Sequence, residues 1–174
     1  TAVYRGNPFI VEAGLAYGAG MPAEEMIDLW RFANRVPLQY QQSACAVTRA
    51  AIATDWRNYG LQQSRGALPS GPMVLFVHIA SVWVPFTSES KEAIAAYPEI
   101  VRELRLGLQE IGRRLGGFLR HRRRLAEAEK KKSYIRSYIP HIGIALREIL
   151  GLTAKQESEI VSVLTDTLER SRKT

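Results

Sequence analysis

A continuous apolar run, "MVLFVHIASVWVP" at residues 73–85, limits the possible folds of this chain more than any other feature. Its residues are mostly β-branched or aromatic, and Pro85 closes it. The run is too short to cross a bilayer as a helix, and its composition is typical of a strand buried at the centre of a sheet. The rest of the chain must therefore supply neighbouring strands and covering helices.

Two segments before this run predict further strands. The first, "NPFIVEAGLAYGAG" at residues 7–20, places Phe9 and Val11 on one face and Ile10 and Glu12 on the other, and its glycines at 18 and 20 end it. The second is expected at residues 27–32, before Asn34 and Pro37 interrupt the pattern.

A helix is predicted between these strands and the apolar run. The segment "SACAVTRAAIATDWRNYG" at residues 43–60 spaces small apolar residues as a helix does, with Ser43 as its N-cap and Gly60 as its stop. The layout is then β-β-α-β, which predicts an α/β fold.

From Ser88 onward the spacing becomes helical. Apolar residues step by three, four and seven positions along a helical seam: Leu104, Leu108, Ile111, Leu115, Phe118 and Leu125. The helix is expected to start or kink at Pro98. Glycines are poor helix formers, so those at 107, 112, 116 and 117 indicate close packing against another element.

The long helix is predicted to end at Pro140. A short apolar helix stopped by Gly151 would follow, and then a last helix that begins with Thr153 and Gln156 in a capping box. These expectations divide the chain into an α/β core at 1–97, a long basic helix at 98–139 and a helical tail at 140–174 that docks a partner.

The positive charge of the chain is concentrated in one segment. The formal net charge is +7, and residues 102–136 hold twelve of the 24 Lys and Arg residues but only four Glu. Such a segment favours an anionic partner and predicts nucleic acid, bound through phosphates and without sequence preference. The alternative is a solvated helix of mixed charge. The candidate phosphate contacts are Arg120, Arg122, Arg123 and Arg124.

Nothing in the residues forms a self-contained active site. The three histidines, His78, His121 and His141, lack the paired spacing of metal ligands, and His78 inside the apolar run is better explained as structural. Cys45 is the only cysteine, so no disulfide framework or zinc site is possible, and a small buried residue is the better interpretation than a catalytic thiol. A reducing intracellular setting follows.

The motif "TDWRNYG" has two interpretations. Trp56, Arg57 and Tyr59 lie within four residues, and Arg can contact phosphate while aromatic rings stack on bases or sugars. The alternative is a helix end with Trp56 buried in the core and Tyr59 beside it.

Five longer motifs make a family resemblance visible. The stretches "YRGNPFIVEAGLAYG", "RFANRVPL", "DWRNYG", "GPMVLFVHIASVWVPFTSESKEAIA" and "YIPHIGIALREILG" closely resemble the B subunit of DNA topoisomerase VI, the type IIB topoisomerase of archaea and plants. The resemblance covers most of the chain and corresponds to the transducer domain and its exit helix. It implies an α/β sandwich with a left-handed β-α-β crossover, although right-handed crossovers are the general rule.

The resemblance also implies roles for particular residues. Lys91, in "TSESK", stands where transducers of this class present a switch lysine to the γ-phosphate of ATP. A W-K-x-Y pattern implicated in DNA contact corresponds to Trp56, Arg57 and Tyr59, with Arg57 in place of the lysine.

Cofactors and partners follow from the same resemblance. ATP and Mg²⁺ would be held mainly by a GHKL-type ATPase module that precedes the transducer in the family, and the chain, which does not begin with Met, is expected to be part of a longer protein. The implied partners are double-stranded DNA and the topoisomerase VI A subunit, which carries the nucleophilic tyrosine, in an A2B2 heterotetramer. No membrane partner is expected. The expected location is intracellular, in the cytoplasm or nucleoid of an archaeon or in the nucleus of a eukaryote.

Two other functions compete with this interpretation. One is a non-enzymatic nucleic-acid-binding module that uses the basic helix, and the other is a structural adaptor whose basic helix is merely solvated.

Overall fold

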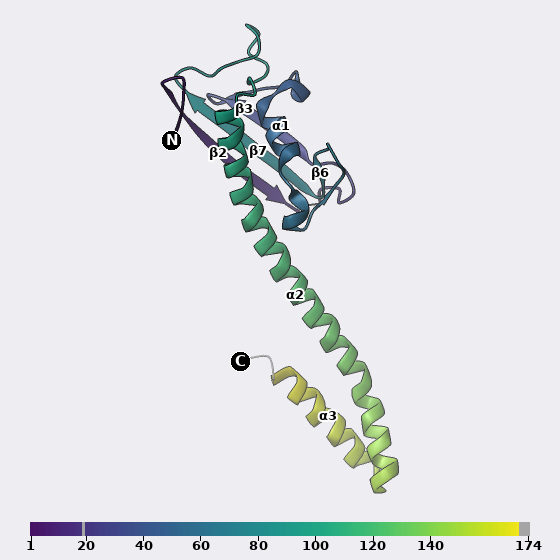
Figure 1. The fold of residues 1–174 in the computed structure, drawn as a ribbon. Helices are drawn as coiled ribbons and strands as arrows, with labels where there is room; N and C mark the ends of the chain where they lie inside the picture. Colours follow the sequence, from purple (N-terminus) through teal and green to yellow (C-terminus); the bar gives the residue numbers. More distant parts are fainter. Residues whose placement is uncertain (19, 171–174) are drawn as a thin grey trace. The chain divides into compact units, whose positions relative to one another are not determined.

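The computed structural model describes residues 1–18 and 20–170, and its chain forms two compact units, residues 1–119 and 120–174. The first unit is built on a five-stranded sheet with the strand order β1-β2-β7-β3-β4 (Figure 1). The strands are β1 (Ala2–Tyr4), β2 (Asn7–Tyr17), β3 (Asp28–Ala33), β4 (Val36–Pro37) and β7 (Met73–Ser81). The fold is of mixed α/β class, as predicted.

Strand β7 occupies the centre of the sheet, which confirms the prediction for the apolar run. It pairs antiparallel with β2 from Phe9↔Ser81 to Tyr17↔Met73, and parallel with β3 from Asp28↔Val74 to Ala33↔Ile79. Burial alternates along it, so Leu75, Val77 and Ile79 are buried on one face while the side chains between them are half-buried. The run is therefore covered fully on one face only.

Helices cover the buried face of the sheet. Helix α1 (Ala46–Ala53) contributes Val47 and Ala50, and the beginning of helix α2 (Pro98–Leu150) contributes Leu104 and Leu108 to the same core. Short elements complete the unit: η1 (Gln42–Ala44), η2 (Trp56–Tyr59), β5 (Gln62–Gln63) and β6 (Pro69–Ser70). Helix α1 lies in the connection between the parallel strands β3 and β7, whose left-handed sense stays a prediction.

The opposite face of the sheet carries polar and aromatic pairs. Trp30 and Phe76 contact edge to face with ring centroids 5.5 Å apart. His78 Nδ1 lies 2.7 Å from the Glu12 carboxylate, and its Nε2 accepts a hydrogen bond from the Arg35 backbone N–H at 3.1 Å. His78 thus ties three chain segments together, which is a structural role.

The start of α1 differs from the prediction. Ser43 lies inside η1, and Cys45 is the N-cap residue of α1, with no side-chain capping bond. Cys45 is fully buried, so its small side chain fills space where the chain turns into the helix. Gly60, with φ of 92°, ends η2 rather than α1.

Helix α2 begins at Pro98, ten residues after the point where helical spacing starts at Ser88. It also continues through Pro140 to Leu150, so the predicted end at Pro140 is wrong. A proline inside a helix removes one backbone hydrogen bond and crowds the carbonyl four residues earlier. Pro140 is exposed, and the helix is continuous on both sides of it.

The predicted seam of α2 is buried at Leu104, Leu108 and Leu115. Phe118 and Leu125 are 49% and 58% exposed, so the buried part of the seam ends near residue 115.

The second unit pairs the last part of α2 with helix α3 (Ala154–Arg170). Gly151 adopts φ of 65°, and the predicted capping box is present, because Gln156 Oε1 accepts from Thr153 N–H at 2.9 Å and Thr153 Oγ1 from Gln156 N–H at 3.4 Å. Ion pairs join the helices at Arg136–Glu169 and Arg147–Glu157, each 2.8 Å long.

Candidate functional site

The segment between β7 and α2, residues 82–97, is an ordered loop that we call the lysine loop. Its entry is fixed at Ser81, whose backbone N–H and C=O are both bonded to the Asn34 side chain at 3.0 and 2.9 Å. The Ser81 hydroxyl donates to the Pro8 carbonyl at 2.9 Å. The loop therefore leaves the sheet from a point held by two other chain segments.

The lysine loop folds as a small hairpin. Ala95 N–H donates to the Pro85 carbonyl at 2.8 Å, and Thr87 N–H donates to the Ala93 carbonyl at 2.9 Å. Ala93 and Ile94 are fully buried in the core, and the Ile94 carbonyl accepts from the Ala46 N–H at the start of α1 at 2.8 Å. Burial of one arm anchors the hairpin and leaves residues 88–91 exposed at its tip.

Lys91 lies at this tip. Its backbone N–H donates to the Ser88 carbonyl at 3.2 Å, and its φ of 55° places it in the left-handed region. Non-glycine residues adopt this conformation rarely, and mostly where surrounding structure imposes it. Within residues 1–18 and 20–170 the ammonium forms no ion pair, although Glu89 and Glu92 are close in sequence. An exposed, unpaired ammonium on an anchored hairpin can bind a phosphate without first losing a partner.

Aromatic rings fix the point where the loop joins α2. The rings of Tyr4 and Tyr97 stack with centroids 4.5 Å apart, and the Arg5 guanidinium lies 5.5 Å from each centroid. Tyr4 is buried, and its hydroxyl has no hydrogen-bond partner. Burial raises the pKa of the Tyr4 phenol to about 12.

We expect Tyr4→Phe to unfold in urea at a concentration equal to or above that of the wild type, because it removes a buried hydroxyl that lacks a partner. The pKa of this phenol is about 12 in the folded chain and near its ordinary value of 10 in the unfolded chain. Between these two pH values the folded phenol is protonated and the unfolded phenol is ionised. Wild-type stability should therefore fall as pH rises through this window, and Tyr4→Phe should fall less. Tyr40→Phe, which changes an exposed tyrosine, is the control. If Tyr4→Phe lowers the free energy of unfolding more than Tyr40→Phe does, the prediction is wrong.

The structure separates the three residues of the "WRNY" motif. Trp56 is fully buried, with its indole N–H donating to the Ala51 carbonyl at 2.8 Å. The predicted contact of Trp56 with DNA is therefore wrong for the folded domain, because none of its ring is accessible. Tyr59 is partly buried and packs edge to face on Trp56 with centroids 6.1 Å apart.

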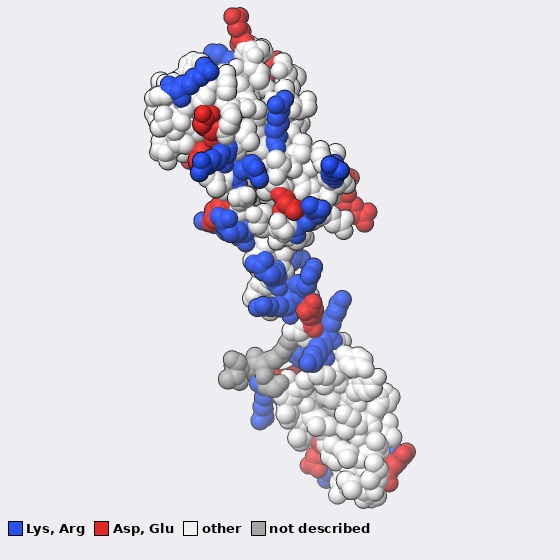
Figure 2. Space-filling view, viewed as in Figure 1, with Lys and Arg blue, Asp and Glu red and all other residues white. Residues whose placement is uncertain are grey.

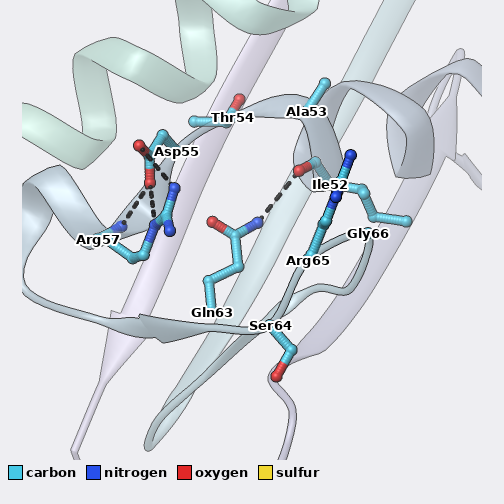
Figure 3. A pocket seen from close by; sticks show the side chains of 9 residues that line it. All are labelled: Ile52, Ala53, Thr54, Asp55, Arg57, Gln63, Ser64, Arg65 and Gly66. Carbon is cyan, nitrogen blue, oxygen red and sulfur yellow. Dashed lines mark hydrogen bonds and ion pairs between the residues drawn. The ribbon is translucent and has the colours of Figure 1, made fainter.

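Arg57 is exposed, but it already has an anionic partner. Its Nε lies 2.8 Å and its Nη2 3.2 Å from the two carboxylate oxygens of Asp55. This pairing lowers the pKa of the Asp55 carboxyl and raises that of the Arg57 guanidinium. Both residues line a hollow of about 350 Å³, in which Gln63 lies between this pair and Arg65 (Figure 3). A phosphate bound by Arg57 would compete with Asp55.

The basic candidates on α2 are all exposed. Figure 2 shows Lys and Arg side chains gathered over the middle of this helix with few acidic ones among them. Arg113 and Arg114 are paired with Glu110, which lowers the pKa of that carboxyl. In the described part of the chain, Arg120, Arg123 and Arg124 form no ion pair, and Arg122 is exposed beside them. The sequence identified this cluster from charge density alone.

Neither a metal site nor a membrane segment is visible in the described ranges 1–18 and 20–170. No three His, Cys, Asp or Glu side chains lie together as metal ligands. No helix there is both long and apolar enough to cross a bilayer.

A sheet covered by helices on one face, followed by a loop and a long helix, defines a domain of mixed α/β class. The family model described as "Topoisomerase VI B subunit, transducer" matches residues 1–131. The chain belongs to this family.

Curated relatives agree with the family assignment. The B subunit of type 2 DNA topoisomerase 6 from Methanosarcina acetivorans is 43% identical over 99% of this chain and 28% of that protein. Its counterpart of the same name from Archaeoglobus fulgidus is 45% identical over 92% of this chain and 26% of its own length. Among solved structures, the B subunit of DNA gyrase from Myxococcus xanthus is similar with a TM-score of 0.42 and 22% identity, over 65% of this chain and 32% of that chain. The chain thus spans about a quarter of the length of these curated relatives.

Proposed function

We propose that this chain is the transducer part of the ATPase subunit of an ATP-dependent type IIB DNA topoisomerase. In this proposal it couples ATP binding and hydrolysis to the passage of one DNA duplex through another. The observation that carries the proposal is Lys91, an exposed and unpaired ammonium held at the tip of a hairpin whose base is buried. Substitution of Lys91 in the full-length subunit, described in the Discussion, is the test.

Lys91 would contact the γ-phosphate of ATP. An ammonium is a compact point charge that suits a phosphate oxygen, and the contact is lost when the γ-phosphate leaves. The remaining contacts to ATP, and those to Mg²⁺, would come from a part of the full-length protein outside this chain. The described residues offer no cluster of carboxylates for the metal.

Helix α2 would transmit the change at Lys91. The lysine loop ends at Tyr97, and α2 begins at the next residue and runs for 53 residues. Tyr97 is held by its stack on Tyr4, and Ile100 and Leu104 are buried in the core, so the first turns of α2 are rigidly attached to the base of the loop. A shift of the loop would be passed directly into a continuous helix, which can act as a lever.

DNA would bind through phosphates rather than through base contacts. Arg57, Arg120, Arg122, Arg123 and Arg124 are the proposed contacts, with Tyr59 beside Arg57. The alternative of a non-enzymatic nucleic-acid-binding module rests on the same arginines. That alternative does not account for the ordered lysine loop.

Neutralising the helix cluster should flatten the salt dependence of DNA binding. A variant with Arg120, Arg122, Arg123 and Arg124 changed to Gln is expected to reduce the slope of log K against log salt by about 3–4, because each phosphate contact contributes about 0.9. Fluorescence anisotropy with a double-stranded oligonucleotide measures the slope.

A control of equal net charge shows whether position matters. It neutralises four exposed basic residues outside the segment at residues 102–136: Arg35, Arg49, Lys155 and Arg170. The control should keep most of the wild-type slope. Equal effects of both variants would assign the binding to overall charge, and no binding by the wild type at low salt would favour the structural adaptor.

The second unit would dock the A subunit in an A2B2 heterotetramer. The paired helices leave apolar side chains exposed, including Tyr138, Ile142 and Ile149. Exposed apolar side chains grouped on one small unit are typical of a protein interface. In this assembly the nucleophilic tyrosine belongs to the A subunit.

A further inference from the structure

The side chain of Asn34 closes the end of the central strand. The backbone N–H of Asn34, the first residue after β3, donates to the Ile79 carbonyl at 2.9 Å. Its side-chain Nδ2 donates to the Ser81 carbonyl at 2.9 Å, and its Oδ1 accepts from the Ser81 N–H at 3.0 Å. The pairing of β3 with β7 ends at Ala33↔Ile79. The amide of Asn34 therefore takes the place of one more residue of β3, because it offers Ser81 the donor and the acceptor that a neighbouring strand would offer.

The turn that carries Asn34 is itself held against β7. Asn34 and Arg35 are the two residues between the paired ends of β3 and β4, and their φ angles of 47° and 70° lie in the left-handed region. Two-residue hairpin turns favour positive φ at both positions, and Asn tolerates it better than most residues. The Arg35 N–H donates to His78 Nε2 at 3.1 Å. The turn thus has a fixed place beside β7, from which the Asn34 amide reaches Ser81.

Ser81 is the residue at which the first arm of the lysine loop leaves the sheet. Only Val82 and Trp83, which are 91% and 51% exposed, separate Ser81 from the buried residues of that arm. The arm then pairs with the returning arm, beginning with the bond from the Ala95 N–H to the Pro85 carbonyl at 2.8 Å. The returning arm is fixed by its own burial in the core. The first arm is tied to the sheet at Ser81, so the place of the hairpin tip also depends on how that residue is held.

We propose that Asn34 is a positioning residue for Lys91. By holding Ser81, it keeps the first arm of the loop, and with it the ammonium at the tip, in one place. A cation lowers a reaction barrier most when it already stands where charge develops, because it need not be moved there during the reaction. Asn34 acts through the loop and contributes no group to the nucleotide. The effect on catalysis rests on the proposed function of Lys91.

Hydrogen exchange in this chain tests whether Asn34 holds the loop. Asn34→Gly keeps the left-handed conformation and removes both side-chain bonds. Asn34→Asp keeps the size of the side chain but loses the donor to the Ser81 carbonyl. In both variants the amides of Thr87 and Ala95, which bond across the two arms, should exchange at least about fivefold faster than in the wild type, relative to amides in the middle of β7.

Arg35→Gly is the matched control, since it changes the neighbouring position of the same turn and leaves the Asn34 amide in place. Its loop amides should exchange as those of the wild type do. The inference is overturned if Asn34→Gly and Asn34→Asp also exchange at the wild-type rate. It is overturned as well if exchange throughout β7 rises with that of the loop, because Asn34 would then support the sheet in general.

Kinetics of the full-length subunit test whether the position of the loop matters for ATP hydrolysis. Asn34→Gly should lower kcat by about 3- to 10-fold and leave the KM for ATP within about twofold of the wild-type value. In a Lys91→Asn background Asn34→Gly should cause no further loss, because no ammonium is left to position. Equal fold losses in the two backgrounds would overturn the positioning role. A wild-type rate in Lys91→Asn alone would refute the proposed function of Lys91, and the exchange experiment would still show whether Asn34 holds the loop.

Discussion

Replacing Lys91 by Ala in the full-length subunit is expected to slow ATP hydrolysis and DNA strand passage by about 10- to 100-fold, while ATP binding stays largely intact. The reason is the position of the ammonium, which the hairpin presents without any competing carboxylate. Such a cation stabilises the charge that develops on the γ-phosphate, and it contributes little to holding the rest of the nucleotide. Rates of phosphate release and of supercoil relaxation, measured together with nucleotide affinity, check the expectation.

The conformation of Lys91 calls for a second variant. With φ at 55°, Ala could disturb the turn as well as remove the charge. Asn tolerates the left-handed region better than most residues, so Lys91→Asn removes the charge and keeps the turn. Both variants should lose activity to the same extent. Glu89→Gln, at the same exposed tip, is the matched control and should behave as wild type.

Relaxation of supercoiled DNA by Lys91→Asn at the wild-type rate would refute the switch role. Loss of nucleotide binding in parallel with activity would also refute it, because Lys91 would then be a general binding residue.

Gly112→Ala should lower the free energy of unfolding by about 1–2 kcal/mol, the net of overpacking and of the better helix propensity of Ala. A Cβ at Gly112 would lie 2.5 Å from ring carbons of Tyr59. Tyr59 packs edge to face on the buried Trp56, so its ring has little room to withdraw. The substitution therefore also probes how closely α2 packs on the "WRNY" segment.

Gly117→Ala is the matched control in the same helix. Nothing lies within 4 Å of a Cβ there, so Ala should raise the free energy of unfolding by about 0.5–1 kcal/mol through helix propensity alone. Urea unfolding of both variants measures the difference. If both variants are stabilised, the contact between Gly112 and Tyr59 is loose.

The strands were predictable from sequence because their patterns arise from the chain itself. The apolar run at residues 73–85 predicts a central strand, alternation predicts β2, and the strand expected at residues 27–32 corresponds to β3. The capping box at Thr153 and Gln156 was also predictable, since a cap depends on neighbouring residues only. Lys91 was found through the family resemblance and not through any local pattern.

Other features depend on tertiary contacts and were missed. The spacing of residues from Ser88 to Pro98 predicts a helix. In the structure these residues belong to a hairpin, because Ala93 and Ile94 are buried in the core, and helix α2 begins only at Pro98. A tryptophan in "WRNY" has the same sequence signature whether it stacks on a base or fills a core, and only the fold shows that Trp56 is buried. Pro140 is a stop signal in sequence, but helix α2 continues through it to Leu150.

Helix α1 is hydrogen-bonded at one end to the lysine loop and at the other end to the segment after it, so it contacts both candidate sites of the first unit. Its first N–H is bonded to the carbonyl of Ile94 in the lysine loop, and the carbonyls of its last turns accept from the Trp56 indole and from Gln63. Its buried face is made of Ala46, Val47, Ala50 and Ala51, short side chains that leave almost no internal freedom to absorb a displacement. The helix therefore joins the lysine loop to the segment that carries Arg57 and Tyr59 through hydrogen bonds at its two ends.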